Sequence, residues 1–169
     1  NPMPAPMWSS MCGIIGCISN WAGGRSTRPF AKRLQRGCDA LSHRGPDQGR
    51  VWFDDPVRPS VGLGHRRLAV FGGESATQPI SDESGSVVMV VNGELYDPES
   101  QLKRRLEQQG HRFRTLGDSE LALHAYLQFG LEFVDHLNGE FAILLYDTRC
   151  RRWVAARPLH SHCRSTYSR

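Results

Sequence analysis

Cys12 carries the side chain best suited to covalent chemistry in this chain. A cysteine at a chain's N-terminus has a nucleophilic thiol and a free α-amine, whose pKa of about 7.7–8.0 lets it act as the activating base. Ten residues precede Met11, so Cys12 must first become the N-terminus. The alternative is a structural core cysteine in the apolar strand expected at residues 12–19.

Three further segments could bind charge, and each has a structural alternative. In Arg66-Arg67, one guanidinium could clamp a carboxylate through two hydrogen bonds, or both could be solvated on an edge strand. Asn92-Gly93 could supply a side-chain amide and a backbone N–H to an oxyanion hole, or form a tight turn after a strand. Asp118 could accept from an ammonium group or cap a helix. With the thiol, these groups would complement a free α-amino acid that has an electrophilic side-chain carbonyl, and glutamine is the obvious candidate.

The hydrophobic pattern predicts the strands and helices that would position these residues. Strands are expected at residues 12–19, 51–53, 61–70, 87–91, 141–146 and 153–156. Helices are expected at residues 29–41, 98–109 and 131–137, and from a cap at Asp118 or Ser119. In the first helix, Phe30, Leu34, Cys38 and Leu41 fall on one apolar face. The strand at 12–19 is expected to be buried, and the strand at 87–91 is expected to be fully buried and to stop at Asn92-Gly93. This order indicates layered α and β elements.

Composition narrows the possible classes of protein. A chain of 169 residues with 39% hydrophobic and 22% charged residues is typical of one soluble globular domain. No apolar run approaches the roughly 20 residues of a membrane span. The net charge of +4 is weak evidence for a nucleic-acid partner, because part of it comes from arginines near the C-terminus. Five cysteines without a C-x-x-C pair favour neither zinc nor a disulfide framework, and a reduced cytoplasmic setting fits best.

Eight short segments, in order, resemble the class II glutamine amidotransferase domain, an N-terminal-nucleophile hydrolase. They lie at residues 11–16, 43–47, 64–68, 78–79, 92–96, 110–115, 118–120 and 139–143. The segments H-R-G-P-D, G-H-R-R-L and N-G-E-L-Y are similar to those of the asparagine synthetase branch. The resemblance therefore implies an α+β fold, an αββα sandwich of two antiparallel sheets.

The resemblance also implies a mechanism and a set of site residues. The cysteine would form a γ-glutamyl thioester that water hydrolyses to glutamate while ammonia is released. Segment 43–47 would be a turn that supports the site. The implied roles are nucleophile for Cys12, oxyanion hole for Asn92 and Gly93, carboxylate binding for Arg67 with the adjacent Leu68, and contact with the substrate's amino end for Glu94 and Asp118.

Three departures from the family pattern bear on domain organisation. Residues 1–11 are expected to be a leader that is disordered or removed, or sequence upstream of a true start at Met11. Residues 12–157 are expected to form the amidotransferase domain, and residues 158–169 an aberrant tail left by a frameshift or deletion. The adenylating S-G-G-x-D-S loop does not occur. The chain is therefore interpreted as a truncated fragment whose sandwich lacks its closing strands.

The leading hypothesis is the glutaminase half of an asparagine synthetase-like protein of asparagine biosynthesis. No cofactor or metal is expected in this domain, and ATP and Mg²⁺ are expected only in the missing synthetase domain. Glutamine is the expected partner, with a synthetase domain or subunit in trans as a further candidate, and neither nucleic acid nor membrane is expected. The alternatives are an inactive truncated remnant, a domain that supplies ammonia to another amidation, and, least favoured, a basic nucleic-acid binder.

Overall fold

The computed structural model of the chain describes residues 12–19, 28–68, 77–115 and 117–158. The predicted leader at 1–11 and most of the predicted tail at 158–169 lie outside these residues. The chain divides into two compact units, Asn1–Val70 and Phe71–Arg169, called here the N-terminal and C-terminal units. Each is described by itself.

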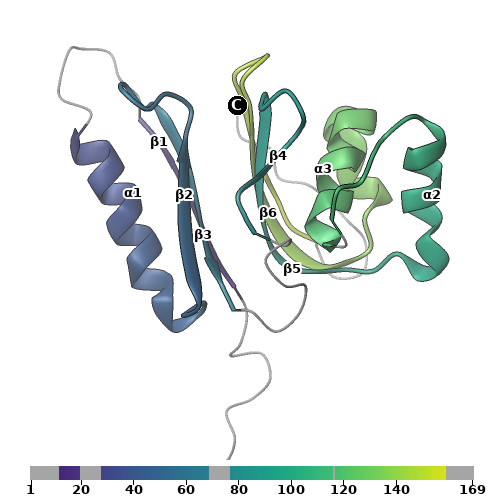
Figure 1. The fold of residues 1–169 in the computed structure, drawn as a ribbon, viewed down its shortest axis with the longest axis horizontal. Coiled ribbons are helices and arrows are strands. Elements are labelled where there is room, and N and C mark those ends of the chain that lie inside the picture. Colours follow the sequence, from purple (N-terminus) through teal and green to yellow (C-terminus); the bar gives the residue numbers. More distant parts are fainter. Residues whose placement is uncertain (1–11, 20–27, 69–76, 116, 159–169) are drawn as a thin grey trace, which may run out of the picture. The chain divides into compact units, whose positions relative to one another are not determined.

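The N-terminal unit is a three-stranded antiparallel sheet with one helix packed on it (Figure 1). The strand order is β1-β3-β2, so β3 is central. Its elements are β1 (Gly13–Ile18), α1 (Arg28–Ala40), the 3₁₀ turn η2 (Leu41–His43), β2 (Gln48–Phe53) and β3 (Val61–Arg67).

The predicted apolar face of α1 is the face that packs on this sheet. Phe30, Leu34 and Cys38 recur at four-residue spacing and are 8%, 1% and 0% exposed. Leu34 and Cys38 pack over Gly62 and Gly64 of the central strand, where an added Cβ would meet their side chains. Burial raises the pKa of the Cys38 thiol, which lies 3.7 Å from the His65 carbonyl oxygen. Cys38 is therefore a structural core cysteine.

The C-terminal unit is a four-stranded antiparallel sheet in the order β4-β5-β6-β7 with helices on one side (Figure 1). Its strands are β4 (Ile80–Ser81), β5 (Val87–Leu95), β6 (Gly139–Asp147) and β7 (Arg152–Ala156). Its helical elements are η4 (Pro98–Ser100), α2 (Gln101–Gln108), α3 (Asp118–Phe129) and η5 (Gly130–His136).

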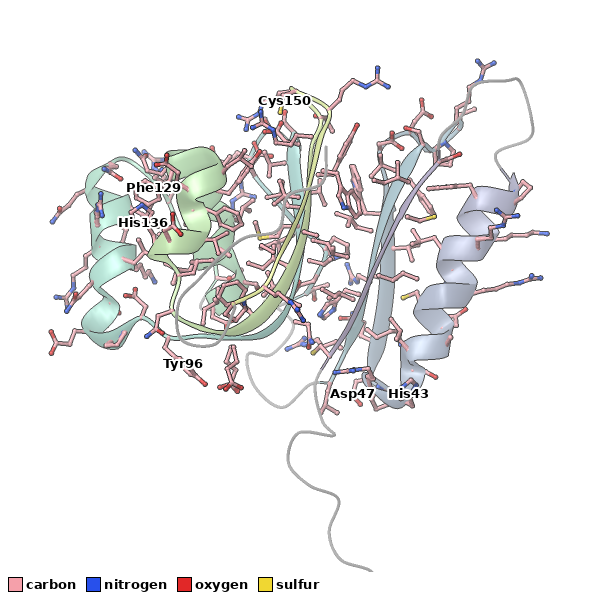
Figure 2. All side chains as sticks on the ribbon, turned by 180° about the vertical axis from the view of Figure 1, so that it is seen from behind. His43, Asp47, Tyr96, Phe129, His136 and Cys150 are labelled. Carbon is pink, nitrogen blue, oxygen red and sulfur yellow. The ribbon has the colours of Figure 1, made fainter. Side chains whose placement is uncertain are left out.

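The core of this unit lies between the sheet and α3. Met89 and Val91 of β5 and Ala122 of α3 are at most 3% exposed and belong to one apolar cluster. Outside this core, α3 and η5 contact each other through two side-chain rings. Phe129 of α3 and His136 of η5 lie side by side (Figure 2), with ring centroids 3.9 Å apart. The Arg105 guanidinium of α2 lies 5.0 Å from the Phe129 ring centroid, a cation–π contact.

The predicted α+β class with two antiparallel sheets is confirmed, but several local predictions are wrong. β5 does not stop at Asn92-Gly93, because pairing with β6 continues to Leu95 opposite Gly139. The expected buried strand at 12–19 is β1, an outer strand whose Ile18 is 56% exposed. The helix expected from residue 98 does begin there, but as the 3₁₀ turn η4, and it becomes α-helical only at Gln101.

Two further differences concern strand and helix ends. β3 ends at Arg67, and residues 69–70 of its predicted extension lie outside the described residues. The N-cap of α3 is Gly117, so Asp118 and Ser119 lie inside its first turn. Within the described parts of the chain, no helix is both long and apolar enough to cross a membrane.

Candidate active site

The seven predicted site residues are divided between the two units. The N-terminal unit holds Cys12, Arg67 and Leu68, and the C-terminal unit holds Asn92, Gly93, Glu94 and Asp118. Within each unit the structure brings residues far apart in sequence into contact. Two partial sites can therefore be described, one around the thiol and one around the end of β5.

The thiol of Cys12 is held by the backbone at the end of β3. The pairing of β1 with β3 sets Gly13 opposite Arg66, which brings the preceding Cys12 to the end of the central strand. There the Leu68 N–H donates to Cys12 Sγ at 3.4 Å. Cys12 is partly exposed, so the structure does not support the alternative of a buried core cysteine.

Arg67 directly precedes Leu68 on the central strand β3, and only 8% of its surface is exposed. The alternative of solvated arginines on an edge strand is therefore wrong. The sequence could not indicate that β3 is the central strand, because its neighbours β1 and β2 both precede it in the chain and flank it only in the folded sheet.

The segment at residues 43–47 supports the end of β3. Arg66 Nε donates to the Gly45 carbonyl oxygen at 2.9 Å, and the Asp47 N–H donates to the Arg67 carbonyl oxygen at 3.1 Å. A side chain at Gly45 would overlap the Arg66 carbonyl group, so only glycine allows this approach. Figure 2 shows His43 and Asp47 at the same end of the unit. The expected structural role of this segment fits these contacts.

The second partial site lies where β5 passes Asn92 and Gly93. Gly93 has a φ of +123°, a conformation that strongly favours glycine. A Cβ at this position would overlap the carbonyl oxygen of Glu140 on β6. Gly93 is thus required by close strand contact, and the predicted tight turn is wrong.

Asn92 contributes a polar side chain on the face of β5 opposite the helices, since successive strand residues alternate between faces. Its Oδ1 is buried and has no hydrogen-bond partner among the described residues. Leaving such an atom unpaired costs about 1–3 kcal/mol, and such exceptions are informative in a native fold. The same amide carries Nδ2, which is the donor that an oxyanion would need.

Asp118 reaches the same end of β5 from the start of α3. Its Oδ2 accepts a hydrogen bond from the Leu95 N–H at 2.9 Å. The carboxylate therefore contacts the strand two residues beyond Gly93. Glu94 lies between Gly93 and Leu95 on β5 and is exposed.

Two residues of the C-terminal unit, Gln78 and Glu120, had no role predicted from the sequence but hold the backbone near this site. Gln78 binds the backbone of Val91 through both polar atoms of its side chain, at 2.6 and 3.0 Å. Glu120 accepts from the Arg114 and Thr115 N–H groups at 2.8 and 2.7 Å. Gln78 lies in segment 78–79 and Glu120 in segment 118–120, two of the eight segments that resemble the family. This resemblance could have drawn attention to both residues, but their hydrogen-bond partners could be identified only from the tertiary structure.

Metal binding has no support in the part of the chain that the structure describes. No group of three or more His, Cys, Asp or Glu side chains there could hold a metal ion. The described site residues offer a thiol and hydrogen-bond donors.

Comparisons with known proteins place this chain among its relatives. The sequence model of the glutamine amidotransferase domain matches residues 11–159. "Asparagine synthetase [glutamine-hydrolyzing] 2" of Oryza sativa is 39% identical over 153 residues, and "Asparagine synthetase [glutamine-hydrolyzing] 3" of Bacillus subtilis is 37% identical over 150. "Amidase chry2" of Gibberella zeae is 38% identical over 156 residues.

These matches cover 90%, 87% and 87% of this chain. The chain in turn spans 24%, 23% and 22% of those proteins, about a quarter of their length. The solved glutamine phosphoribosylpyrophosphate amidotransferase of B. subtilis matches with a TM-score of 0.63 and 22% identity. That match covers 87% of this chain and 36% of the solved one, and it supports the predicted fold.

Proposed function

Because this chain belongs to the glutamine amidotransferase domain family, we propose that it hydrolyses glutamine to glutamate and ammonia with Cys12 as the nucleophile. The observation that carries this proposal is the position of Cys12. Cys12 is partly exposed, and its Sγ accepts a hydrogen bond from the Leu68 N–H at 3.4 Å. Leu68 directly follows Arg67 in the chain. A thiol and a guanidinium anchored on the same strand end suit a substrate with both an acyl group and a carboxylate.

The proposed reaction has two steps. Sγ attacks the γ-carbonyl carbon of glutamine, and the thiol proton passes through the α-amine of Cys12 to the leaving nitrogen. The C–N bond breaks, ammonia leaves, and a γ-glutamyl thioester remains. Water then adds to the thioester carbonyl, the C–S bond breaks, a proton from the water returns to the sulfur, and glutamate is released as the free thiol is regenerated.

The donors at the end of β5 are assigned to the charge that develops in both steps. The tetrahedral intermediates carry an oxyanion, which Asn92 Nδ2 and the Gly93 N–H would stabilise. Arg67, with Leu68, would bind the substrate carboxylate. Glu94 and Asp118 would contact its ammonium group.

We further propose that the ammonia is used to amidate aspartate. Several similar proteins are named asparagine synthetases, and this chain corresponds to about a quarter of their length. A synthetase domain or subunit would then be the partner, with ATP and Mg²⁺ bound there and no cofactor here. The reduced thiol of Cys12 fits a cytoplasmic setting.

A second candidate is ammonia supply to a different amidation. It is favoured by the 38% identity to "Amidase chry2", a relative that is not named an asparagine synthetase and whose identity lies between the 37% and 39% of the two asparagine synthetases. The two candidates share the glutaminase reaction and differ only in the acceptor. An acceptor screen with aspartate and other carboxylates would separate them once the partner is in hand.

The experiment compares the 169-residue chain with the same chain started at Met11, whose removal exposes Cys12. Mass spectrometry identifies the mature N-terminus, and an assay follows ammonia release from glutamine. We expect release when Cys12 is the N-terminus, and a loss of at least about 10³-fold in Cys12→Ala. Cys17→Ala is the matched control on the same strand, with expected activity within about twofold of the parent. A chain that starts at Cys12 and releases no ammonia would indicate an inactive remnant.

A further inference from the structure

In β5, the backbone N–H and C=O of one residue point to the same edge of the strand, and those of the next residue point to the other edge. Every second residue therefore turns its N–H and C=O toward the β4 side, and the residues between them toward the β6 side. The Val87 carbonyl accepts from the Asp82 N–H at 3.1 Å on the β4 side, and the Tyr96 N–H donates to the Asn138 carbonyl at 2.7 Å on the β6 side. The alternation is therefore unbroken along the strand. The groups on the β4 side belong to Val87, Met89, Val91, Gly93 and Leu95.

β4 pairs with only part of this edge. It is two residues long, and its pairing ends where Ile80 lies opposite Met89. At the next position on the edge, the carboxamide of Gln78 replaces a strand residue. The Val91 N–H donates to Gln78 Oε1 at 2.6 Å, and Gln78 Nε2 donates to the Val91 carbonyl oxygen at 3.0 Å.

A second side chain holds the same edge further along. The Leu95 N–H donates to Asp118 Oδ2 at 2.9 Å. The Gly93 N–H lies between these two contacts, with Gln78 on one side and Asp118 on the other. Gly93 needs such support, because glycine weakens a strand and leaves the local backbone free to move.

We propose that Gln78 is a positioning residue, which holds Val91 and thereby fixes the Asn92 side chain and the Gly93 N–H as an oxyanion hole. This inference rests on the proposed function of the site. Preorganised donors stabilise an oxyanion without rearrangement during the reaction. A displacement of about 1 Å can cost roughly 10²-fold in rate, so a residue that touches no substrate can control the rate.

Only a side chain that both accepts and donates can make this pair of bonds. A glutamate at position 78 would still accept from the Val91 N–H, but its ionised carboxylate would face the Val91 carbonyl oxygen without a proton to donate. Protonation restores the donor, and the ordinary glutamate pKa is about 4.3. The defect of Gln78→Glu should therefore be repaired as the pH falls, which a general loss of folding would not produce.

The variants are made in the 169-residue chain and in the same chain started at Met11. At pH 7.5 we expect Gln78→Glu to lower kcat for glutamine by about 10–100-fold, with KM within about threefold of the parent. The ratio of variant to parent kcat should rise severalfold between pH 7.5 and pH 4.5. Gln108→Glu adds the same charge at an exposed position of α2 and should leave both constants unchanged.

A flat ratio across this pH range, an unchanged kcat, or a loss carried by KM would overturn the proposal. Amide hydrogen exchange of peptides spanning residues 90–94 provides a readout that needs no catalysis. We expect faster exchange there in Gln78→Glu than in the parent or in Gln108→Glu. If the parent hydrolyses no glutamine, the proposed function fails, but unchanged exchange would separately overturn the role of Gln78.

Discussion

Individual residues at the end of β5 combine a structural requirement with an assigned chemical role. Gly93 has a φ of +123° and lies against Glu140, so a side chain at this position would displace the backbone that carries the proposed oxyanion donor. Asp118 binds the Leu95 N–H through one carboxylate oxygen. Substitutions at these two residues should therefore separate stability from substrate binding.

Gly93→Ala should destabilise the protein by more than about 3 kcal/mol, because the new methyl group overlaps Glu140 in a strained conformation. Urea unfolding measures this change. Gly85→Ala is the control, since Gly85 has a φ of +70° and no described atom lies within 4 Å of the place that a methyl group would occupy. It should cost only about 1 kcal/mol. Equal costs would contradict the required close contact at Gly93.

Asp118→Asn should raise the KM for glutamine by about 10–100-fold with kcat little changed, because a hydrogen bond to a charged group contributes about 1.5–3 kcal/mol. The asparagine Oδ1 can still accept from the Leu95 N–H, so the fold should be kept. Steady-state kinetics provides the measurement, and Asp135→Asn at an exposed position of η5 is the control. A fall in kcat at constant KM would argue against ammonium binding by Asp118.

Among the elements, the loop before α3 is fixed by Glu120. Burial raises the pKa of this carboxyl, but hydrogen bonds from Arg114 and Thr115 outweigh it and hold the pKa below the usual 4.5. His124 lies 3.5 Å away and adds attraction when protonated. Because the folded-state pKa is depressed, the ionised carboxylate stabilises the protein above about pH 4.5, and this contribution is lost as the pH falls below that value.

Glu120→Gln should therefore lower the free energy of unfolding by about 1–3 kcal/mol at pH 7, and the difference from the parent should shrink below pH 4.5. Urea titrations at pH 7 and pH 3.5 test this. Glu107→Gln, at an exposed position of α2, should show a negligible difference at both. A difference for Glu120→Gln that stays constant over this range would rule out stabilisation by the ionised carboxylate.

Elements were predictable where the pattern was local. The apolar spacing of Phe30, Leu34 and Cys38 predicted α1 and its buried face. The end of β5 was not predictable, because Asn-Gly usually forms a turn, and here pairing with β6 continues through it. The role of Gln78 was also hidden, since its carboxamide replaces a strand that is only two residues long.

Across the whole molecule, the predicted site residues are distributed over two units with different architectures. The thiol and Arg67 belong to the three-stranded unit, and the proposed oxyanion donors and Asp118 belong to the four-stranded unit. Short motifs in a fixed order could indicate the family without any of this geometry. The supports behind the motifs, at Gly45, Gln78 and Glu120, required the structure.

Trapping of the γ-glutamyl thioester is the decisive test of Cys12 as the nucleophile for glutamine. The form that begins at Cys12 is mixed with glutamine, quenched in acid during turnover, and mapped by peptide mass spectrometry. We predict a γ-glutamyl adduct that fragmentation of the N-terminal peptide assigns to Cys12 and not to Cys17, and no adduct on Cys38, Cys150 or Cys163. An adduct on another cysteine, or glutamate formation without any adduct on Cys12, would contradict this assignment.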